Sequence, residues 1–212
     1  MSDSTAIVFL GGDHVPAGTL DDLPTDAFVI GADSGIDHAL AHHWVVDLAV
    51  GDFDSVSAHG LAAVEDSGAV IDRHPAEKDQ TDFELALGAA LAHGAQKVVV
   101  VGGHGGRVDH FLANALVLLA ERYRGVVIEA RFGTARVHVV RDRLVLLGEP
   151  GELVTLLAVT GPVFGIVTSG LRYRLSGESL TPGSSRGVSN ELVDPTASIS
   201  VTDGDLLVIR PG

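Results

Sequence analysis

The chain has 212 residues, 46% of them hydrophobic, a net charge of −14 and no cysteine. This length allows one large domain or two small ones. The missing cysteines exclude disulfides and thiolate metal sites, and the acidic balance without a basic stripe argues against a nucleic-acid partner. No stretch approaches the ~20 apolar residues of a membrane span, and the N-terminus lacks the basic region of a signal peptide. We therefore expect a soluble, cytoplasmic protein with no membrane partner.

Short apolar runs alternate with amphipathic stretches in the first part of the chain. The predicted strands are 6–10, 27–30, 48–50, 70–72, 98–101 and 126–130. The clearest predicted helices are 81–93 and 109–123. Strands that alternate with helices indicate a Rossmann-like, mostly parallel sheet with helices on both faces.

The pattern changes after Gly133. Short β-type runs follow one another, separated by Gly, Pro, Asp and Ser, and no helical periodicity is visible. Regular short strands with turn residues between them predict an all-β sandwich or barrel. We predict two domains, an α/β domain over residues 1–133 and a β-sandwich over residues 134–212.

The segment GDFDSV at 51–56 places two carboxylates, Asp52 and Asp54, directly after an apolar run. They therefore lie at the C-terminal end of a predicted buried strand, where open α/β sheets bind ligands. Two close carboxylates repel each other, and Mg²⁺ is bound through one or two carboxylates together with substrate phosphates. An ordinary turn is the alternative, because all but two of these residues are turn formers.

Other acidic segments fall at the same kind of position. GADSG at 31–35 follows a strand, EKDQTDFE at 77–84 precedes a helix, and GGHGGRVDH at 102–110 follows a strand. Because these positions share one edge of a doubly wound sheet, we expect the following carboxylates to converge: Asp33, Asp52, Asp54, Asp79, Asp82 and Asp109. Capping is the alternative for several of them, since Thr81 and Glu84 fit a capping box and Asp109 is a plausible N-cap.

Two of the few cations accompany these motifs. Lys78 precedes Asp79, and Arg107 lies two residues before Asp109. Both can contact phosphate oxygens, Arg107 as a planar fork and Lys78 as a point charge; a surface ion pair is the alternative. Glycine turns at 11–12, 102–103 and 105–106 allow backbone N–H groups to approach phosphates. No P-loop motif is present.

One long polar segment, 169–192, interrupts the predicted β domain. Its Ser189 and Asn190 offer a hydroxyl and an amide that can satisfy a heteroaromatic ring, and Tyr173 offers a flat face. An ordinary β loop is the alternative interpretation.

The segments GADSG, GDFDSV, EKDQTD and GGRVDH, in this order and spacing, resemble the catalytic domain of the thiamine pyrophosphokinase (thiamine diphosphokinase) family. GLRYRL followed by SSRGVSN is similar to that family's thiamine-binding β domain, so the resemblance covers nearly the whole chain. It implies transfer of the pyrophosphoryl group of ATP to the hydroxyl of thiamine, with AMP leaving. It also implies a homodimer that binds thiamine between the α/β domain of one subunit and the β domain of the other.

The resemblance also implies roles for individual residues. Four carboxylates would hold Mg²⁺ and the phosphates and act in catalysis together with Arg107: Asp52, Asp54, Asp82 and Asp109. Four residues and Arg107 would help to bind ATP: Asp33, Gly35, Lys78 and Thr81. Three residues would line the thiamine pocket: Tyr173, Ser189 and Asn190.

The chain departs from the family pattern at Ser34 and Ile36, where the family often has ADGGA, and at Tyr173, where many members carry Trp. Two other functions stay open from the residues alone. One is a nucleotide-dependent phosphotransferase with a different alcohol as acceptor, and the other is a non-catalytic ATP- or thiamine-sensing module.

Overall fold

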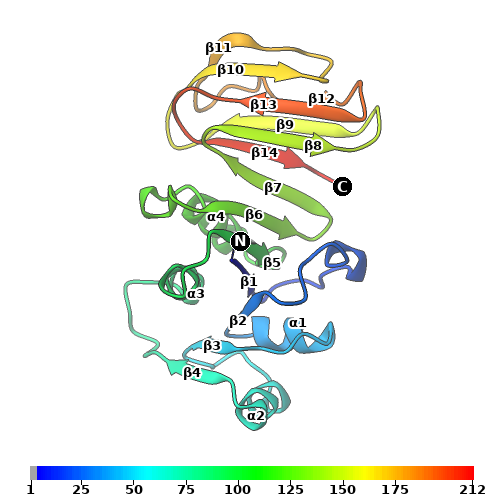
Figure 1. Ribbon diagram of the computed structural model, residues 1–212. Helices are drawn as coiled ribbons and strands as arrows, with labels where there is room; N and C mark the ends of the chain where they lie inside the picture. The colour runs from blue at the N-terminus through cyan, green and yellow to red at the C-terminus, as the bar shows by residue number, and fades with distance from the viewer. Residues whose placement is uncertain (1–3) are drawn as a thin grey trace. The chain divides into compact units, whose positions relative to one another are not determined.

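The computed structural model describes residues 4–212 (Figure 1). The chain divides into two compact units, and each is described here by itself. The first unit runs up to Val117 and also includes Gly125–Thr134; the second consists of Leu118–Arg124 and Ala135–Gly212. The main division thus falls at Thr134, and the short segment Leu118–Arg124 belongs to the second unit although it lies before that division in the chain.

The first unit contains a six-stranded parallel sheet in the order β6-β5-β1-β2-β3-β4. Its strands are β1 Thr5–Phe9, β2 Phe28–Ala32, β3 Leu48–Gly51, β4 Val70–Arg73, β5 Lys97–Val101 and β6 Val127–Phe132. Its helices are α1 Gly35–Ala41, α2 Ala58–Ser67, α3 Asp82–Ala92 and α4 Val108–Val117, with a short 3₁₀ turn at Ala17–Thr19. All six strands lie within two residues of the predicted ends.

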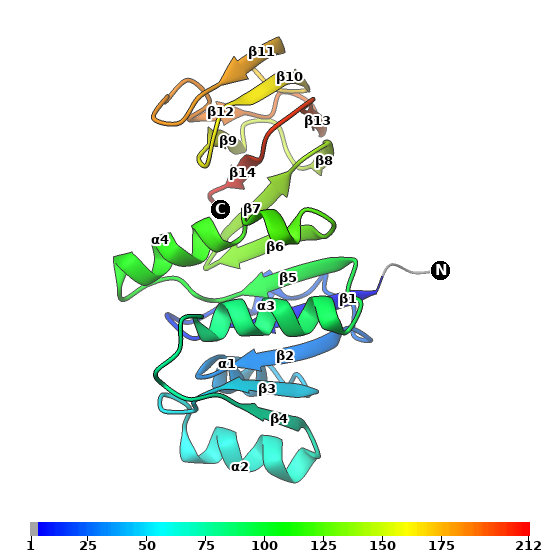
Figure 2. The same ribbon diagram turned by 90° about the vertical axis from the view of Figure 1, so that its left-hand side faces the viewer.

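Helices cover both faces of this sheet, which explains its near-continuous apolar strands. On β1, Ile7 and Phe9 belong to a core cluster that includes Ile36 and Ala39 of α1. The alternate residues of β1 are also fully buried, and α3 contributes its own buried side chains, such as Leu87. Figure 2 shows α3 and α1 on opposite sides of the strands. The expected Rossmann-like α/β architecture is confirmed.

The helix predicted over 109–123 was wrong at its C-terminal end. α4 ends at Val117, and a separate 3₁₀ turn covers Glu121–Tyr123. The apolar pattern continues through Leu118 and Leu119, but both side chains are buried in a turn. The guanidinium of Arg141 donates to the carbonyl oxygens of Leu118 and Tyr123 at 3.4 and 3.0 Å, which satisfies carbonyl groups that a continuing helix would have used.

The second unit is a sandwich of two four-stranded antiparallel sheets, β12-β9-β14-β7 and β11-β10-β13-β8. The strands are β7 Ala135–Val140, β8 Arg143–Leu147, β9 Leu153–Ala158, β10 Val163–Ser169, β11 Ser176–Leu180, β12 Asn190–Glu191, β13 Thr196–Ser200 and β14 Leu206–Arg210. One apolar core contains side chains of both sheets, including Leu156 and Ile166. The expected β-sandwich is confirmed.

Four regular elements lie outside the sequence prediction. Helix α1 has only seven residues, and α2 buries only Gly60 and Val64, so neither gives a clear periodic apolar pattern. Strands β11 and β12 lie inside the polar segment 169–192 and have little apolar alternation. Within residues 4–212, no helix is long and apolar enough to cross a membrane.

Candidate active site

The strand order reverses between β1 and β5, because the chain continues from β1 to β2 on one side and returns to β5 on the other. Open α/β sheets bind ligands at such a switch point, beyond the carboxyl ends of the strands. Two glycine-rich loops leave these strands and are tied together. Gly103 donates its N–H to the carbonyl oxygen of Gly11 at 2.7 Å, and Asp13 donates to that of His104 at 2.9 Å.

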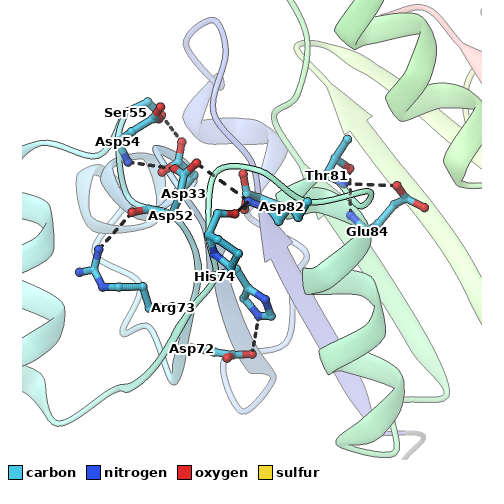
Figure 3. A network of polar contacts seen from close by, with 12 residues as sticks. Asp33, Asp52, Asp54, Ser55, Asp72, Arg73, His74, Thr81, Asp82 and Glu84 are labelled. Carbon is cyan, nitrogen blue, oxygen red and sulfur yellow. Dashed lines mark hydrogen bonds and ion pairs between the residues drawn. The ribbon is translucent and has the colours of Figure 1, made fainter.

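Three carboxylates meet beside these loops. Asp33 follows β2, Asp52 follows β3, and Asp82 is the first residue of α3. Each offers one oxygen atom, and these three oxygens lie within 4.8 Å of one another. Figure 3 shows the three side chains pointing toward one another from separate segments. The structure therefore brings together three of the six carboxylates that were expected to converge.

Local hydrogen bonds fix this arrangement. The Ser55 hydroxyl donates to Oδ2 of Asp33, and the Asp54 N–H donates to Oδ1 of Asp52 at 3.1 Å. Between the two aspartates, Phe53 adopts a left-handed φ of 64° and is buried beneath the Arg73 guanidinium, 4.6 Å from its ring centroid. The turn thus exists, as the alternative interpretation proposed, and it also presents Asp52 to the cluster.

Asp54 lies next to the cluster and is not one of its three members. Its side chain is exposed and lines the same pocket. The negative charge of Asp52, followed by that of Asp33, raises the pKa of the Asp54 carboxyl above its ordinary value. This corner of the protein therefore carries more negative charge than its own cations balance.

Lys78 is the cation closest to the cluster. Its Nζ lies 3.0 Å from Oδ1 of Asp82 and 3.9 Å from Oδ2 of Asp52, and it also donates to the Pro75 carbonyl. Thr81 lies nearby but is occupied: its hydroxyl accepts from the Glu84 N–H while Glu84 accepts from the Thr81 N–H. The capping box that the sequence suggested is therefore present, and it fixes the start of α3 with Asp82 in place.

Arg107 and Asp109 form an exposed ion pair. Nη2 of Arg107 donates to Oδ2 of Asp109 at 2.5 Å, and Nε donates to Oδ1 at 3.2 Å. This hydrogen bonding lowers the pKa of Asp109 to about 2. Arg107 lines the pocket, whereas Asp109 does not, and Asp109 is absent from the carboxylate cluster. Asp79 is exposed and likewise outside the pocket lining.

A pocket of about 570 Å³ joins these features within the first unit. Residues not singled out from the sequence also line it: Ser55, Gln80, His104, His110 and Asn114. Asn114 donates to the Gly103 carbonyl at 3.1 Å and so holds one glycine loop against α4. Gly35 supports the site indirectly, because a Cβ there would lie 2.0 Å from the Phe9 carbonyl oxygen.

The three residues expected in the thiamine pocket lie in the second unit and differ in accessibility. Tyr173 is 64% exposed and Ser189 is exposed, with a left-handed φ of 56°. Asn190 is only 3% exposed. Its amide accepts from the Tyr173 N–H at 2.9 Å and donates to the Tyr173 carbonyl at 2.8 Å, so both of its polar ends are used within the protein.

Two family descriptions match the chain. Residues 22–129 match the "Thiamin pyrophosphokinase, catalytic domain", and residues 138–206 match the "Thiamin pyrophosphokinase, vitamin B1 binding domain". The chain belongs to the thiamin pyrophosphokinase family. The expected enzymatic assignment is thereby confirmed: transfer of a pyrophosphoryl group to thiamine, with ATP as the co-substrate.

Relatives of the thiamin pyrophosphokinase family share both sequence and fold with this chain. "Thiamine pyrophosphokinase" of Bacillus subtilis is 29% identical over 191 residues, which cover 85% of this chain and 86% of the relative. A crystal structure of the B. subtilis protein superimposes with a TM-score of 0.86 at 25% identity and 98% coverage of each chain. The Geobacillus thermodenitrificans structure gives 0.81 at 28% identity, covering 98% of this chain and 97% of that one. The family member from Candida albicans, at 15% identity, covers 97% of this chain and 89% of its own and shares the fold with a TM-score of 0.78.

Proposed function

We propose that the pocket at the switch point binds the polyphosphate of ATP together with Mg²⁺ for transfer of the pyrophosphoryl group to thiamine. The observation that carries this proposal is the meeting of Asp33, Asp52 and Asp82 beside two glycine-rich loops. Carboxylates suit a hard divalent cation, and open backbone N–H groups suit phosphate oxygens.

The residues present fit a magnesium ion. Oδ1 of Asp33 is buried and has no hydrogen-bond partner, so this oxygen lacks compensation without a cation. Lys78 offsets only part of the charge of the three carboxylates. Asp33, Asp52 and Asp82 would therefore hold the ion, with Asp54 adjacent. Bound there, Mg²⁺ would neutralise charge on the transferring phosphoryl oxygens.

This assignment changes part of the sequence interpretation. The sequence placed Asp33 among the ATP-binding residues and Asp109 among the metal ligands. We now assign Asp33 to the metal and leave Asp109 out of the metal-binding set. Asp109 instead orients the guanidinium of Arg107 through two hydrogen bonds. Arg107 and Lys78 would contact the phosphates, Arg107 as a preorganised donor for charge that develops during transfer. Thr81 and Gly35 act through the fold, by capping α3 and by allowing α1 to approach β1.

In the second unit, we assign the contacts with thiamine to Tyr173 and Ser189. The exposed ring of Tyr173 offers a face to the heteroaromatic rings of the substrate, which also carry a positive charge. Asn190 fixes the backbone that carries Tyr173. We further propose a homodimer in which the α/β unit of one subunit and the β unit of the other share one thiamine site. A cytoplasmic location fits a reaction that consumes ATP.

Measuring AMP release tests this function directly. Purified protein should form AMP and thiamine diphosphate in equal amounts only when ATP, Mg²⁺ and thiamine are all present. AMP release at the same rate without thiamine would contradict the proposed acceptor. ATP binding with no AMP under any condition would instead favour a sensing module.

Two variants, one in each unit, separate effects on thiamine binding from effects on the phosphate site. Tyr173→Ala should raise the KM for thiamine with little change in the KM for ATP, because Tyr173 lies in the other unit from the phosphate pocket. Asp52→Asn should abolish most turnover. Near-normal turnover of folded Asp52→Asn would refute the metal assignment.

A further inference from the structure

A buried arginine lies near the end of β6, next to the loops of the candidate active site. Arg131 is 1% exposed, and within residues 4–212 it is the largest side chain that is almost fully buried. Arginine is almost never fully buried unless it is paired, and the proposed reaction makes no use of this one. Because a buried charge is costly without partners, the contacts of Arg131 show which parts of the fold depend on it.

The guanidinium of Arg131 joins β6 to the segment between β1 and β2, residues 10–27, here called the β1–β2 segment. Its Nη1 and Nη2 donate to the two carboxylate oxygens of Asp22 at 2.6 and 3.2 Å, and Nη1 also donates to the Thr19 carbonyl. On β6 itself, Nε donates to Oε1 of Glu129 at 3.0 Å. A planar fork with five donors can serve both sides at once. One side of the fork therefore holds the β1–β2 segment, and the other holds its own strand.

The backbone around Arg131 contacts the second glycine-rich loop. The Arg131 carbonyl oxygen accepts from the Gly102 N–H at 3.1 Å, where the loop after β5 begins. A Cβ on Gly133 would lie 3.0 Å from Nε2 of His104, so the chain just after β6 also packs against that loop. The Thr19 hydroxyl donates to the Gly133 carbonyl at 3.4 Å. The end of β6 thus contacts the loop after β5 and the β1–β2 segment together.

The β1–β2 segment depends on such contacts for its position. In the described structure it has one short 3₁₀ turn, Ala17–Thr19, and otherwise consists of turns and irregular backbone. It begins with the glycine-rich loop whose Gly11 and Gly12 line the phosphate pocket. Backbone that lacks regular hydrogen bonding opens locally unless other contacts hold it. Thr19 and Asp22 are the points at which Arg131 holds this segment.

We propose that Arg131 is a positioning residue for the phosphate site. Its guanidinium holds the β1–β2 segment and its carbonyl holds the loop after β5, so that the backbone N–H groups of both glycine-rich loops keep one common orientation. The inference rests on the proposed function, because that function assigns these loops to the polyphosphate of ATP. Preorganised donors bind an anion without the cost of ordering the loops. Loss of the contact with Asp22 should therefore weaken ATP binding and spare thiamine, whose assigned contacts lie in the second unit.

Steady-state kinetics of variants with the same change of charge test this role. Asp22→Asn weakens the fork toward the β1–β2 segment and should raise the KM for ATP about tenfold while the KM for thiamine changes less than about twofold. Asp21→Asn is the matched control, because Asp21 is the exposed neighbouring residue, and it should keep both KM values. Glu129→Gln weakens the fork toward its own strand and should lower the melting temperature with the KM for ATP unchanged.

Amide hydrogen exchange of the ligand-free protein reports loop position without any turnover. The N–H groups of Gly103 and Asp13 donate from one glycine-rich loop to the other. In Asp22→Asn these two amides should exchange at least about tenfold faster than in wild type, because the loops separate more often. Neither control variant should show this increase.

Arg131→Lys provides a second test of the same contact. A lysine ammonium is a point charge and cannot hold both oxygens of Asp22 in a fork, so the KM for ATP should rise as in Asp22→Asn. The double variant should raise this KM no further, because both substitutions remove one shared interaction. Additive effects of the two substitutions would contradict action through Asp22.

Two other results would overturn the inference. One is an equal KM for ATP in Asp22→Asn and Asp21→Asn. The other is a Glu129→Gln variant whose KM for ATP rises as much as that of Asp22→Asn, since Arg131 would then act through stability alone. A wild-type protein that forms no AMP would refute the proposed function instead. In that case amide exchange decides the positioning of the loops: faster exchange in Asp22→Asn supports it, and unchanged exchange overturns it.

Discussion

The N–H of Gly103 and the carbonyl oxygen of Gly11, 2.7 Å apart, tie the loop after β5 to the loop after β1. Because these strands flank the point where the sheet order reverses, this bond holds the two glycine-rich loops of the pocket in one position. The neighbouring Gly12 is packed so tightly that a Cβ there would lie 2.3 Å from the His104 carbonyl oxygen.

Gly12→Ala should therefore disrupt the phosphate site. Gly12 has a φ of +118° and no space for a side chain, so alanine would force the two loops apart. We expect a KM for ATP raised at least about tenfold and a lower melting temperature. Gly68→Ala is the control, because its φ of +82° imposes left-handed strain of about 1–2 kcal/mol while nothing lies within 4 Å of the added Cβ and Gly68 is outside the pocket lining. Equal effects of the two variants would show that strain alone, not loop packing, matters.

Magnesium dependence should separate Asp52 from Asp109. Asp52 belongs to the carboxylate cluster, whereas Asp109 pairs with Arg107. Asp52→Asn should raise the Mg²⁺ concentration for half-maximal AMP formation by more than the 10–100-fold typical of a residue that only supports a metal ligand. Asp109→Asn should lower turnover by loosening Arg107 and leave the magnesium requirement unchanged. A shifted magnesium requirement in Asp109→Asn would restore it to the metal-binding set.

Asn190 and Ser189 should respond differently to substitution, although they are neighbours. Asn190→Ala leaves the N–H and the carbonyl of Tyr173 without their partner, so unfolding free energy should fall by about 1–3 kcal/mol. Ser189→Gly suits the left-handed backbone and should leave stability unchanged or higher, while the KM for thiamine rises. Urea unfolding and steady-state kinetics measure the two effects. Full stability of Asn190→Ala would contradict its role in holding Tyr173.

His38 should make the free energy of unfolding depend on pH below about 6.5. Burial lowers the pKa of His38, and neighbouring histidines at 42, 104 and 14 lower it further, although the Leu10 backbone acts in the opposite direction. The unfolded chain therefore binds the proton at a higher pH than the folded chain. Stability should fall as pH decreases from about 6.5 toward the native pKa of His38, and should level off below it.

The control for this pH effect is a histidine on the surface. Between pH 7.5 and 5.5, the melting temperature of His38→Gln should fall less than that of wild type. The melting temperature of His59→Gln, which is changed at an exposed position, should fall as much as that of wild type. Parallel melting curves for His38→Gln and wild type across this range would show that another group controls the acid response.

The strands and the position of the site could be predicted from the sequence because both depend on local patterns. Doubly covered strands such as β1 and β5 are short apolar runs, and the residues after them necessarily share one sheet edge. The β-sandwich followed from regular turn residues. By contrast, α4 was predicted too long, because periodicity cannot reveal that Arg141, far along the chain, binds the carbonyl groups beyond its end.

Membership of the carboxylate cluster could not be read from sequence, because it depends on where side chains point after each turn. Asp52 and Asp54 are equivalent in the motif, but the left-handed Phe53 between them turns only Asp52 toward Asp33 and Asp82. Asn190 presents the same problem in the second unit: its amide could equally have faced a ligand, and only the fold shows that it bonds the Tyr173 backbone.

The first unit has nineteen Asp and Glu residues against five Lys and Arg, whereas the second has nine of each. This unequal charge acts at a distance, before any ligand makes contact. The field of the α/β unit attracts free Mg²⁺ and the thiamine cation and repels bare ATP, which carries several negative charges. Chelation by Mg²⁺ removes part of that repulsion, so under the proposed function the metal-bound nucleotide would be the form that reaches the pocket most readily. Salt screens such fields over about 8–10 Å, so encounter rates with thiamine fall and those with uncomplexed nucleotide rise as ionic strength increases.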